Sequence, residues 1–149
     1  MDTRSFPRSR DLRKGRASCP HQAYLITLVT HKRIPCFTEL SSARLAIRQL
    51  HEPVVARQAV TLAFVVMPDH VHWLLQLEGA AALSDVVRIY KAKVSLGMGQ
   101  RIWQKGFHDH AVRADEDLHA AARYIVANPV RAGLVASVAQ YPHWDAIWL

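Results

Sequence analysis

The sequence predicts an α/β fold of the α+β type, with a mostly antiparallel sheet and helices packed on one face of it. Apolar, β-branched runs alternate with helical runs in the order β-α-β-β-α-β-α. Only a tight turn separates the second and third strand runs, which makes them a hairpin. The chain has 149 residues, 50% of them hydrophobic, so it suits one domain with its own core. This order is a split βαβ arrangement.

The first predicted strand and helix follow residue 20. The run "AYLITLVTH", Ala23 to His31, is apolar and β-branched, which is typical of a strand. Pro35 would interrupt a ladder in "RIPCF", so this segment is expected to be a connection. Ser41 or Ser42 can cap a helix through "ARLAIRQLHE", which we expect to stop before Pro53.

The middle of the chain predicts a hairpin and a second helix. "AVTLAFVVM", Ala59 to Met67, and "HVHWLLQL", His70 to Leu77, are predicted to be strands joined by the turn "MPD". A helix is expected from about Leu83 through "VVRIYKAKVSLGM", with Gly97 and Gly99 ending it.

The last third predicts one more strand and one more helix. "IWQKGFHDHAVR" indicates a fourth, less regular strand. "DEDLHAAARYIVANPVRAGL" indicates a helix whose acidic N-terminal end complements its macrodipole. Because Pro129 lies inside this pattern, the helix is expected to kink or end near Asn128.

Positive charge is concentrated at the N-terminal end of the chain. The net charge is +7, and residues 1–20 contribute +4 of it. We therefore expect residues 1–20 to be a flexible basic arm and residues 21–149 to form a single domain. Such an arm suits a polyanion such as nucleic acid, because each cation that neutralises a phosphate releases counterions. The alternative is a solubilising tail.

Apolar runs, the N-terminal segment and the cysteines indicate the expected compartment of the protein. No stretch of about 18 uncharged apolar residues occurs, so no membrane span is expected. The N-terminus lacks the apolar centre of a secretory signal. Two cysteines, Cys19 and Cys36, do not make a disulfide framework. A reducing cytoplasm is the expected compartment.

His70 and His72 are the first candidate site residues. Strand side chains alternate between faces, so these two imidazoles point the same way on the third strand. Imidazole is the commonest metal ligand in proteins. The alternative is that both are satisfied core histidines, and two ligands rarely make a catalytic centre alone.

The last predicted helix offers two more candidates. Tyr124 and Asn128 are four residues apart, which places them on one side of a helix. Tyr124 is a possible nucleophile, and the amide oxygen of Asn128 could complete a metal shell. The alternatives are a packing tyrosine and an Asn-Pro helix stop. The spacing leaves both interpretations open.

Four segments in order resemble the signature segments of a known family. "YLITLVTHKRIPCF", "MPDHVHWLL", "WQKGFHDHAVR" and "ARYIVANPVRAGLV" are similar to those of the REP-associated tyrosine transposases, members of the single-tyrosine HUH group related to insertion-sequence transposases. The resemblance spans roughly Tyr24 to Trp144. It implies the ferredoxin-like split βαβ HUH fold and a substrate of single-stranded DNA carrying repetitive extragenic palindromic hairpins.

The resemblance also implies roles for individual residues. His70 and His72 of the HUH triplet, with Asn128, would hold Mg²⁺ or Mn²⁺, and Tyr124 would be the nucleophile. The implied activity is cleavage and strand transfer through a covalent 5′-phosphotyrosine intermediate, by a monomer or a homodimer in the cytoplasm, associated with the nucleoid. The alternative function is a non-catalytic nucleic-acid-binding module of ferredoxin-like fold.

Other residues compete for these roles. Tyr90 is interpreted as packing or stacking, because Val94, four residues on, cannot bind a metal. His108 and His110 repeat the i, i+2 spacing and are the main alternative to the predicted metal ligands. Trp73 and Trp103 could stack on bases, although core packing is the expected role.

Several cations are predicted to contact DNA phosphates. The alternative for each is a solvated surface charge. The predicted contacts are Arg8, Arg10, Arg13, Lys14 and Arg16 of the arm, together with Lys91, Lys93, Arg113, Arg123 and Arg131.

Overall fold

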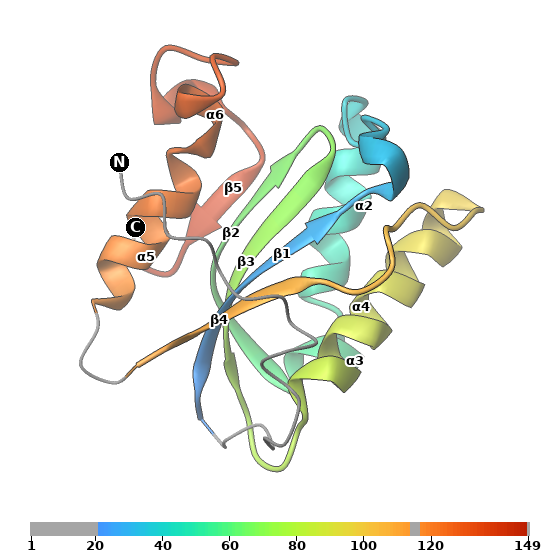
Figure 1. Cartoon of the computed structure of the whole chain (residues 1–149), viewed down its shortest axis with the longest axis vertical. Coiled ribbons are helices and arrows are strands. Elements are labelled where there is room, and N and C mark those ends of the chain that lie inside the picture. The colour runs from blue at the N-terminus through green and yellow to red at the C-terminus, as the bar shows by residue number, and fades with distance from the viewer. Residues whose placement is uncertain (1–20, 114–116, 149) are drawn as a thin grey trace.

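A five-stranded sheet forms the centre of the computed structural model, which describes residues 21–113 and 117–148 (Figure 1). The strand order is β4-β1-β3-β2-β5, and every neighbouring pair is antiparallel. The strands are β1 (Ala23–Val29), β2 (Ala59–Met67), β3 (His70–Leu77), β4 (His108–Val112) and β5 (Trp144–Ala146). The predicted α+β class and antiparallel sheet are confirmed.

Seven helical segments surround this sheet in the described part of the chain. They are η1 (His31–Arg33), α2 (Leu40–Leu50), α3 (Pro53–Ala56), α4 (Leu83–Met98), α5 (Leu118–Val126), α6 (Asn128–Arg131) and η2 (Val138–Gln140). None of these helices is long and apolar enough to cross a membrane. The predicted basic arm lies outside the described residues.

Helices cover both faces of the sheet, so the expectation that they pack on one face is wrong. On the α4 face, Ile26 and Trp73 pack in one core cluster with residues of α2, α3 and α4. On the α5 face, Leu25 and Leu74 pack in a second cluster with Ile125 of α5. Figure 1 shows α5 and α4 on opposite sides of the strands. The physical reason is that β1, β2 and β3 are apolar on both faces, and each face needs a cover.

The predicted hairpin is confirmed with its shortest possible connection. Met67 pairs with His70, so only Pro68 and Asp69 stand between β2 and β3. This register fixes which residues share a face, because a shift of one residue would exchange the faces. His70 and His72 consequently lie on the α5 face with Leu74.

The ends of several helices differ from their predicted positions. α2 starts at Leu40 after Glu39, so neither predicted serine is its N-cap. Gly97 lies inside α4, and Gly99 caps its C-terminus with a φ of 75° in the left-handed region. The last helix ends as expected, since α5 stops before Ala127 and the single turn of α6 follows.

The strand predictions were also incomplete. β4 covers only His108–Val112 of the predicted fourth strand, while Trp103 forms an isolated bridge with Thr30. β5 was not predicted, because three residues carry no readable alternation. Val65 of β2 pairs with Trp144, which places β5 at the edge beyond β2.

Candidate active site

His70 and His72 lie side by side on the α5 face of β3. Their ring centroids are 4.8 Å apart, and the rings meet edge to face at 83°. Both side chains are partly buried. The predicted orientation of the pair is therefore observed.

A carboxylate fixes the orientation of His70. Nδ1 of His70 lies 2.6 Å from Oδ1 of Asp69, and Nε of Arg33 donates to Oδ2 of Asp69 at 3.1 Å. Burial raises the pKa of the Asp69 carboxyl, but the hydrogen bond with His70 and the charges of His70 and Arg33 outweigh this and lower it. An imidazole that donates from Nδ1 to a carboxylate keeps Nε2 available as a ligand.

His72 is held from the neighbouring strand and is neutral at neutral pH. Its Nδ1 lies 2.9 Å from Oγ1 of Thr27, its register partner on β1. Burial lowers the pKa of His72 to about 3, with further lowering by the positive charges of His70, Arg131 and Arg33. Burial also lowers the pKa of His70, against the opposing effect of Asp69. Neutral imidazole is the form that binds metals.

A strained turn brings Arg33 to Asp69. Lys32 and Arg33 have φ values of 53° and 54°, in the left-handed region that residues other than glycine rarely adopt. The hydroxyl of Thr30 donates to the carbonyls of Ile34 at 2.7 Å and Asp69 at 3.0 Å, which ties the end of β1 to the hairpin turn. Left-handed residues of this kind persist where surrounding contacts determine them, and they cluster at functional sites.

Tyr124 lies on α5 over the same face of the sheet. Its ring is partly buried against the cluster that contains Leu74 and Ile125. The guanidinium carbon of Arg131 lies 4.2 Å from the centroid of the Tyr124 ring, in a cation–π contact. Asp117 caps α5 by accepting a hydrogen bond from the backbone N–H of His119 at 2.9 Å. The cap fixes where α5 begins and so where Tyr124 lies along the helix.

Arg131 also holds Asn128. Its Nη2 donates to Oδ1 of Asn128 at 2.8 Å and to the backbone carbonyl of Tyr124 at 2.6 Å. The amide nitrogen of Asn128 is buried, and within residues 21–113 and 117–148 it has no hydrogen-bond partner. A buried donor without a partner costs about 1–3 kcal/mol, which is unusual away from functional sites.

One guanidinium connects the candidates from the two elements. Arg131 contacts Tyr124 and Asn128, and its charge contributes to the lowered pKa of His72. The candidates of the last helix and of β3 therefore lie on the same face of the sheet, within electrostatic reach of one side chain.

The candidate donors could form part of a divalent cation site. The described residues contain no group of three or more His, Cys, Asp and Glu side chains placed to hold a metal, so a site here needs an oxygen from elsewhere. The two imidazoles and the amide oxygen of Asn128 would be a mixed nitrogen and oxygen set, and substrate or water oxygens would have to complete the shell of Mg²⁺ or Mn²⁺.

His108 and His110 lie on the α5 face as well. His108 is paired with Thr27, which is also the partner of His72, so β1 separates the two histidines. Two strands' width places their backbones about 10 Å apart. His108 thus flanks the pair on β3 at a distance.

The other aromatic candidates are structural. Tyr90 is fully buried, its hydroxyl donates to the carbonyl of Ala46 at 2.9 Å, and burial raises its pKa far above its usual range. Trp73 is fully buried, and Trp103 is half-buried beside Tyr90. Both tryptophans therefore pack in or against the core cluster of the α4 face, which is the role expected for them.

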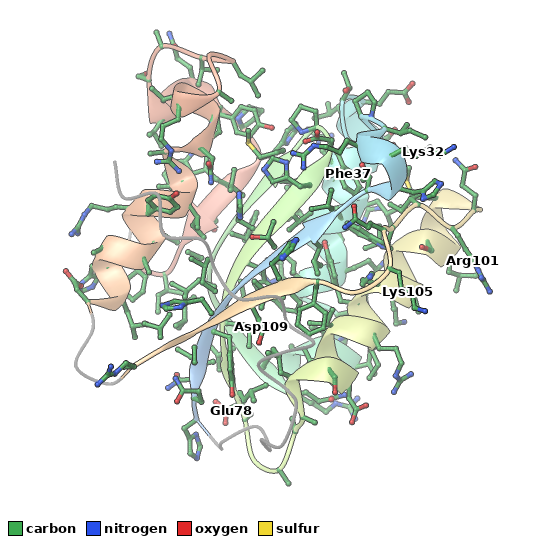
Figure 2. The ribbon with its side chains drawn as sticks, viewed as in Figure 1. Lys32, Phe37, Glu78, Arg101, Lys105 and Asp109 are labelled. Carbon is green, nitrogen blue, oxygen red and sulfur yellow. The ribbon has the colours of Figure 1, made fainter. Side chains whose placement is uncertain are left out.

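The predicted phosphate contacts are spread over the molecule. Nζ of Lys91 donates to the carbonyls of Gln104 and Gly106 at 2.9 Å, beside an open groove of about 900 Å³. Arg101 and Lys105 line this groove next to α4 (Figure 2). Lys91 and Lys93 belong to α4, which packs on the face away from His72.

The remaining cations differ in their surroundings. Arg123 forms an exposed ion pair with Asp117 at 3.5 Å. Arg113 is exposed just after β4, whereas Arg131 belongs to the candidate site. The arm residues lie outside the described part of the chain: Arg8, Arg10, Arg13, Lys14 and Arg16.

Three supporting residues were not recognised in the sequence. Asp69 directly precedes His70, and Thr27 interrupts an apolar strand, so both carried a local signal. Arg33 carried none, because its contact with Asp69 joins positions 36 residues apart.

Comparisons with known proteins show which family the chain resembles. Residues 19–128, which include both histidines, Tyr124 and Asn128, match the family model described as "Transposase IS200 like". The chain is 37% identical over 82 residues to the REP-associated tyrosine transposase of Escherichia coli K12, covering 54% of this chain and 50% of that protein. It is 29% identical over 99 residues to a Haemophilus influenzae KW20 protein provisionally given the same name, covering 56% of each.

A solved structure shares the fold. A REP-associated tyrosine transposase bound to a REP hairpin aligns with a TM-score of 0.71 and 28% sequence identity, covering 87% of this chain and 79% of that one. The chain spans about half the length of the curated relatives it matches. Because the family model covers more than half of the sequence, the chain belongs to the IS200-like transposase family.

Proposed function

We propose that the chain cleaves and rejoins single-stranded DNA next to repetitive extragenic palindromic hairpins, with Tyr124 as the nucleophile. The observation that carries this proposal is the position of Arg131, which contacts Tyr124 and Asn128 and lies within electrostatic reach of His72. The hairpin bound in the related solved structure supports the substrate class.

In the proposed reaction, the phenolic oxygen of Tyr124 bonds to the scissile phosphorus. The bond from phosphorus to the 3′ oxygen breaks, the phenol loses its proton to solvent, and the departing 3′ oxygen takes one up. The DNA 5′ phosphate is then joined to Tyr124. Because the phosphoester is retained, attack by a 3′ hydroxyl reverses the step and joins strands without ATP.

The supporting residues prepare this step. His70, His72 and Asn128 would hold Mg²⁺ or Mn²⁺, which polarises a phosphate and offsets negative charge in the transition state. Asp69 and Thr27 orient the two imidazoles through their Nδ1 atoms.

Exposed cations would hold the DNA backbone. We propose Arg113, Arg123 and Arg131 as phosphate contacts, together with the arm residues. The exposed pair of Arg123 with Asp117 is weak, so a phosphate can displace the carboxylate. Lys91 and Lys93 would contact phosphates only if the DNA strand also reached the α4 face of the sheet.

A single-stranded REP hairpin oligonucleotide, incubated with Mn²⁺ and resolved on a denaturing gel, tests the proposal. The wild-type chain should give a covalent protein–DNA adduct. Tyr124→Phe should give none while a native-gel shift persists, and Tyr24→Phe, which changes a buried phenol on the α4 face, should retain the adduct. An adduct formed by Tyr124→Phe would rule out this nucleophile. A native shift without an adduct from the wild type would favour the non-catalytic binding module.

A further inference from the structure

Arg131 donates a hydrogen bond to the oxygen that the proposed metal site needs. Oδ1 of Asn128 accepts a hydrogen bond from Nη2 of Arg131 at 2.8 Å. An arginine side chain carries donors only, so the amide group facing it is the oxygen, and the buried nitrogen of Asn128 faces away. The side chain that would complete the metal shell therefore already binds a cation.

Two cations at one amide oxygen repel each other. The guanidinium is permanently charged, and its charge reaches His72 on β3 as well as Asn128. A divalent ion approaching both imidazoles would meet this charge at Oδ1. Arg131 and the ion thus compete for the same ligand.

Arg131 can leave this position when a stronger acceptor arrives. Its side chain is exposed, whereas the amide it holds is partly buried. A hydrogen bond from a guanidinium to a phosphate is charge-assisted on both sides and stronger than one to a neutral amide. A DNA phosphate near Tyr124 is the acceptor that the proposed reaction supplies.

We propose that Arg131 is a positioning residue that keeps the Asn128 oxygen from the divalent ion until a DNA phosphate draws the guanidinium away. The proposal rests on the function proposed above, in which His70, His72 and Asn128 hold the ion. Metal binding and DNA binding are then coupled, and by linkage each strengthens the other.

Mn²⁺ affinity of the full chain without DNA, measured by electron paramagnetic resonance of free Mn²⁺, tests this competition. Arg131→Gln should bind Mn²⁺ about fivefold or more tightly than the wild type, at the lower end of typical coupling between sites. Arg131→Met, which keeps an aliphatic stem beside the Tyr124 ring, should do the same and provides a second variant should Arg131→Gln not fold.

The Asn128→Ala background separates competition from simple charge repulsion. If the arginine acts by occupying Oδ1, replacing it in Asn128→Ala should leave Mn²⁺ affinity unchanged. An equal gain in both backgrounds, or no gain in either, would overturn the proposal.

His70→Ala and His72→Ala test the metal site itself. If neither histidine variant changes the Mn²⁺ affinity, the proposed metal site is wrong and this inference is wrong with it. If both histidine variants abolish Mn²⁺ binding and the arginine variants have no effect, only the inference is wrong.

Discussion

The two faces of the sheet share the same strands but differ in how they hold polar groups. On the α4 face, Trp73 and Tyr90 are fully buried, and each polar atom donates one hydrogen bond, to Thr61 and Ala46 respectively. On the α5 face, the imidazoles of His70 and His72 are each held through Nδ1 by a polar neighbour. At the start of β3, the core residues Val71 and Trp73 therefore alternate with the candidate ligands His70 and His72.

The strongest test of this alternation compares neighbours on β3. Trp73→Ala should destabilise the protein by about 3–5 kcal/mol, because a large buried ring leaves a cavity. His72→Ala should fold and lose metal-dependent cleavage. Urea unfolding and the adduct gel measure the two effects. Cleavage at an unchanged rate by His72→Ala would move the metal site toward His108 and His110.

The next largest effect is expected on the pH dependence of stability, which should reveal the buried histidine of the α5 face. Burial lowers the pKa of His72 to about 3 from an ordinary value of 6.5, so between these values the unfolded chain binds more protons. The metal-free protein should therefore lose stability as pH falls from about 6.5 toward 3, by up to about 1.4 kcal/mol for each pH unit from this group. Urea unfolding at several pH values should show this slope reduced in His72→Gln, with His21→Gln as the exposed control. Equal slopes in both variants would contradict the burial of His72.

The support of His70 should contribute a smaller effect on metal affinity. Asp69→Asn removes the carboxylate that orients Nδ1, and loss of such a partner typically weakens metal binding by about 10–100-fold. Arg33→Ala should weaken it less, because Arg33 acts through Asp69. Mn²⁺ titration measures both. A larger loss from Arg33→Ala than from Asp69→Asn would contradict this order.

The smallest effect is expected on the α4 face. Tyr90→Phe removes one hydrogen bond to a helix carbonyl and should cost about 0.5–1.5 kcal/mol of stability. Cleavage should stay at the wild-type rate, as the adduct gel would show. A loss of cleavage without a loss of stability would give Tyr90 a part in the reaction.

The sequence predicted the elements better than their arrangement. Alternation and turn chemistry were enough for β1, β2, β3 and the hairpin, because these signals are local. The side of the sheet that α5 covers was predicted incorrectly, since element order does not determine it. The three residues of β5 gave no periodic signal.

Residue spacing predicted the candidate site only as separate pairs, and the resemblance to a family joined them into one site. Spacing suggested that His70 and His72 share a face and that Tyr124 and Asn128 share another, and the observed face of β3 agrees. The contact between Arg131 and Asn128 spans three residues, a helical spacing that could have been read, although Arg131 was assigned to DNA alone. Tertiary contacts such as that of Arg33 with Asp69 cannot be predicted from local residue spacing, because the two residues are 36 positions apart.

The two-residue connection between β2 and β3 has a practical consequence for engineering this protein. Asp69 is both half of that connection and the partner of His70, so a tag or reporter domain inserted there would displace the imidazole. The opposite end of β3, near Glu78 in Figure 2, is the better insertion point. Gly79 is exposed, with open space around it, so an insert after this residue would leave the histidine end of the hairpin intact.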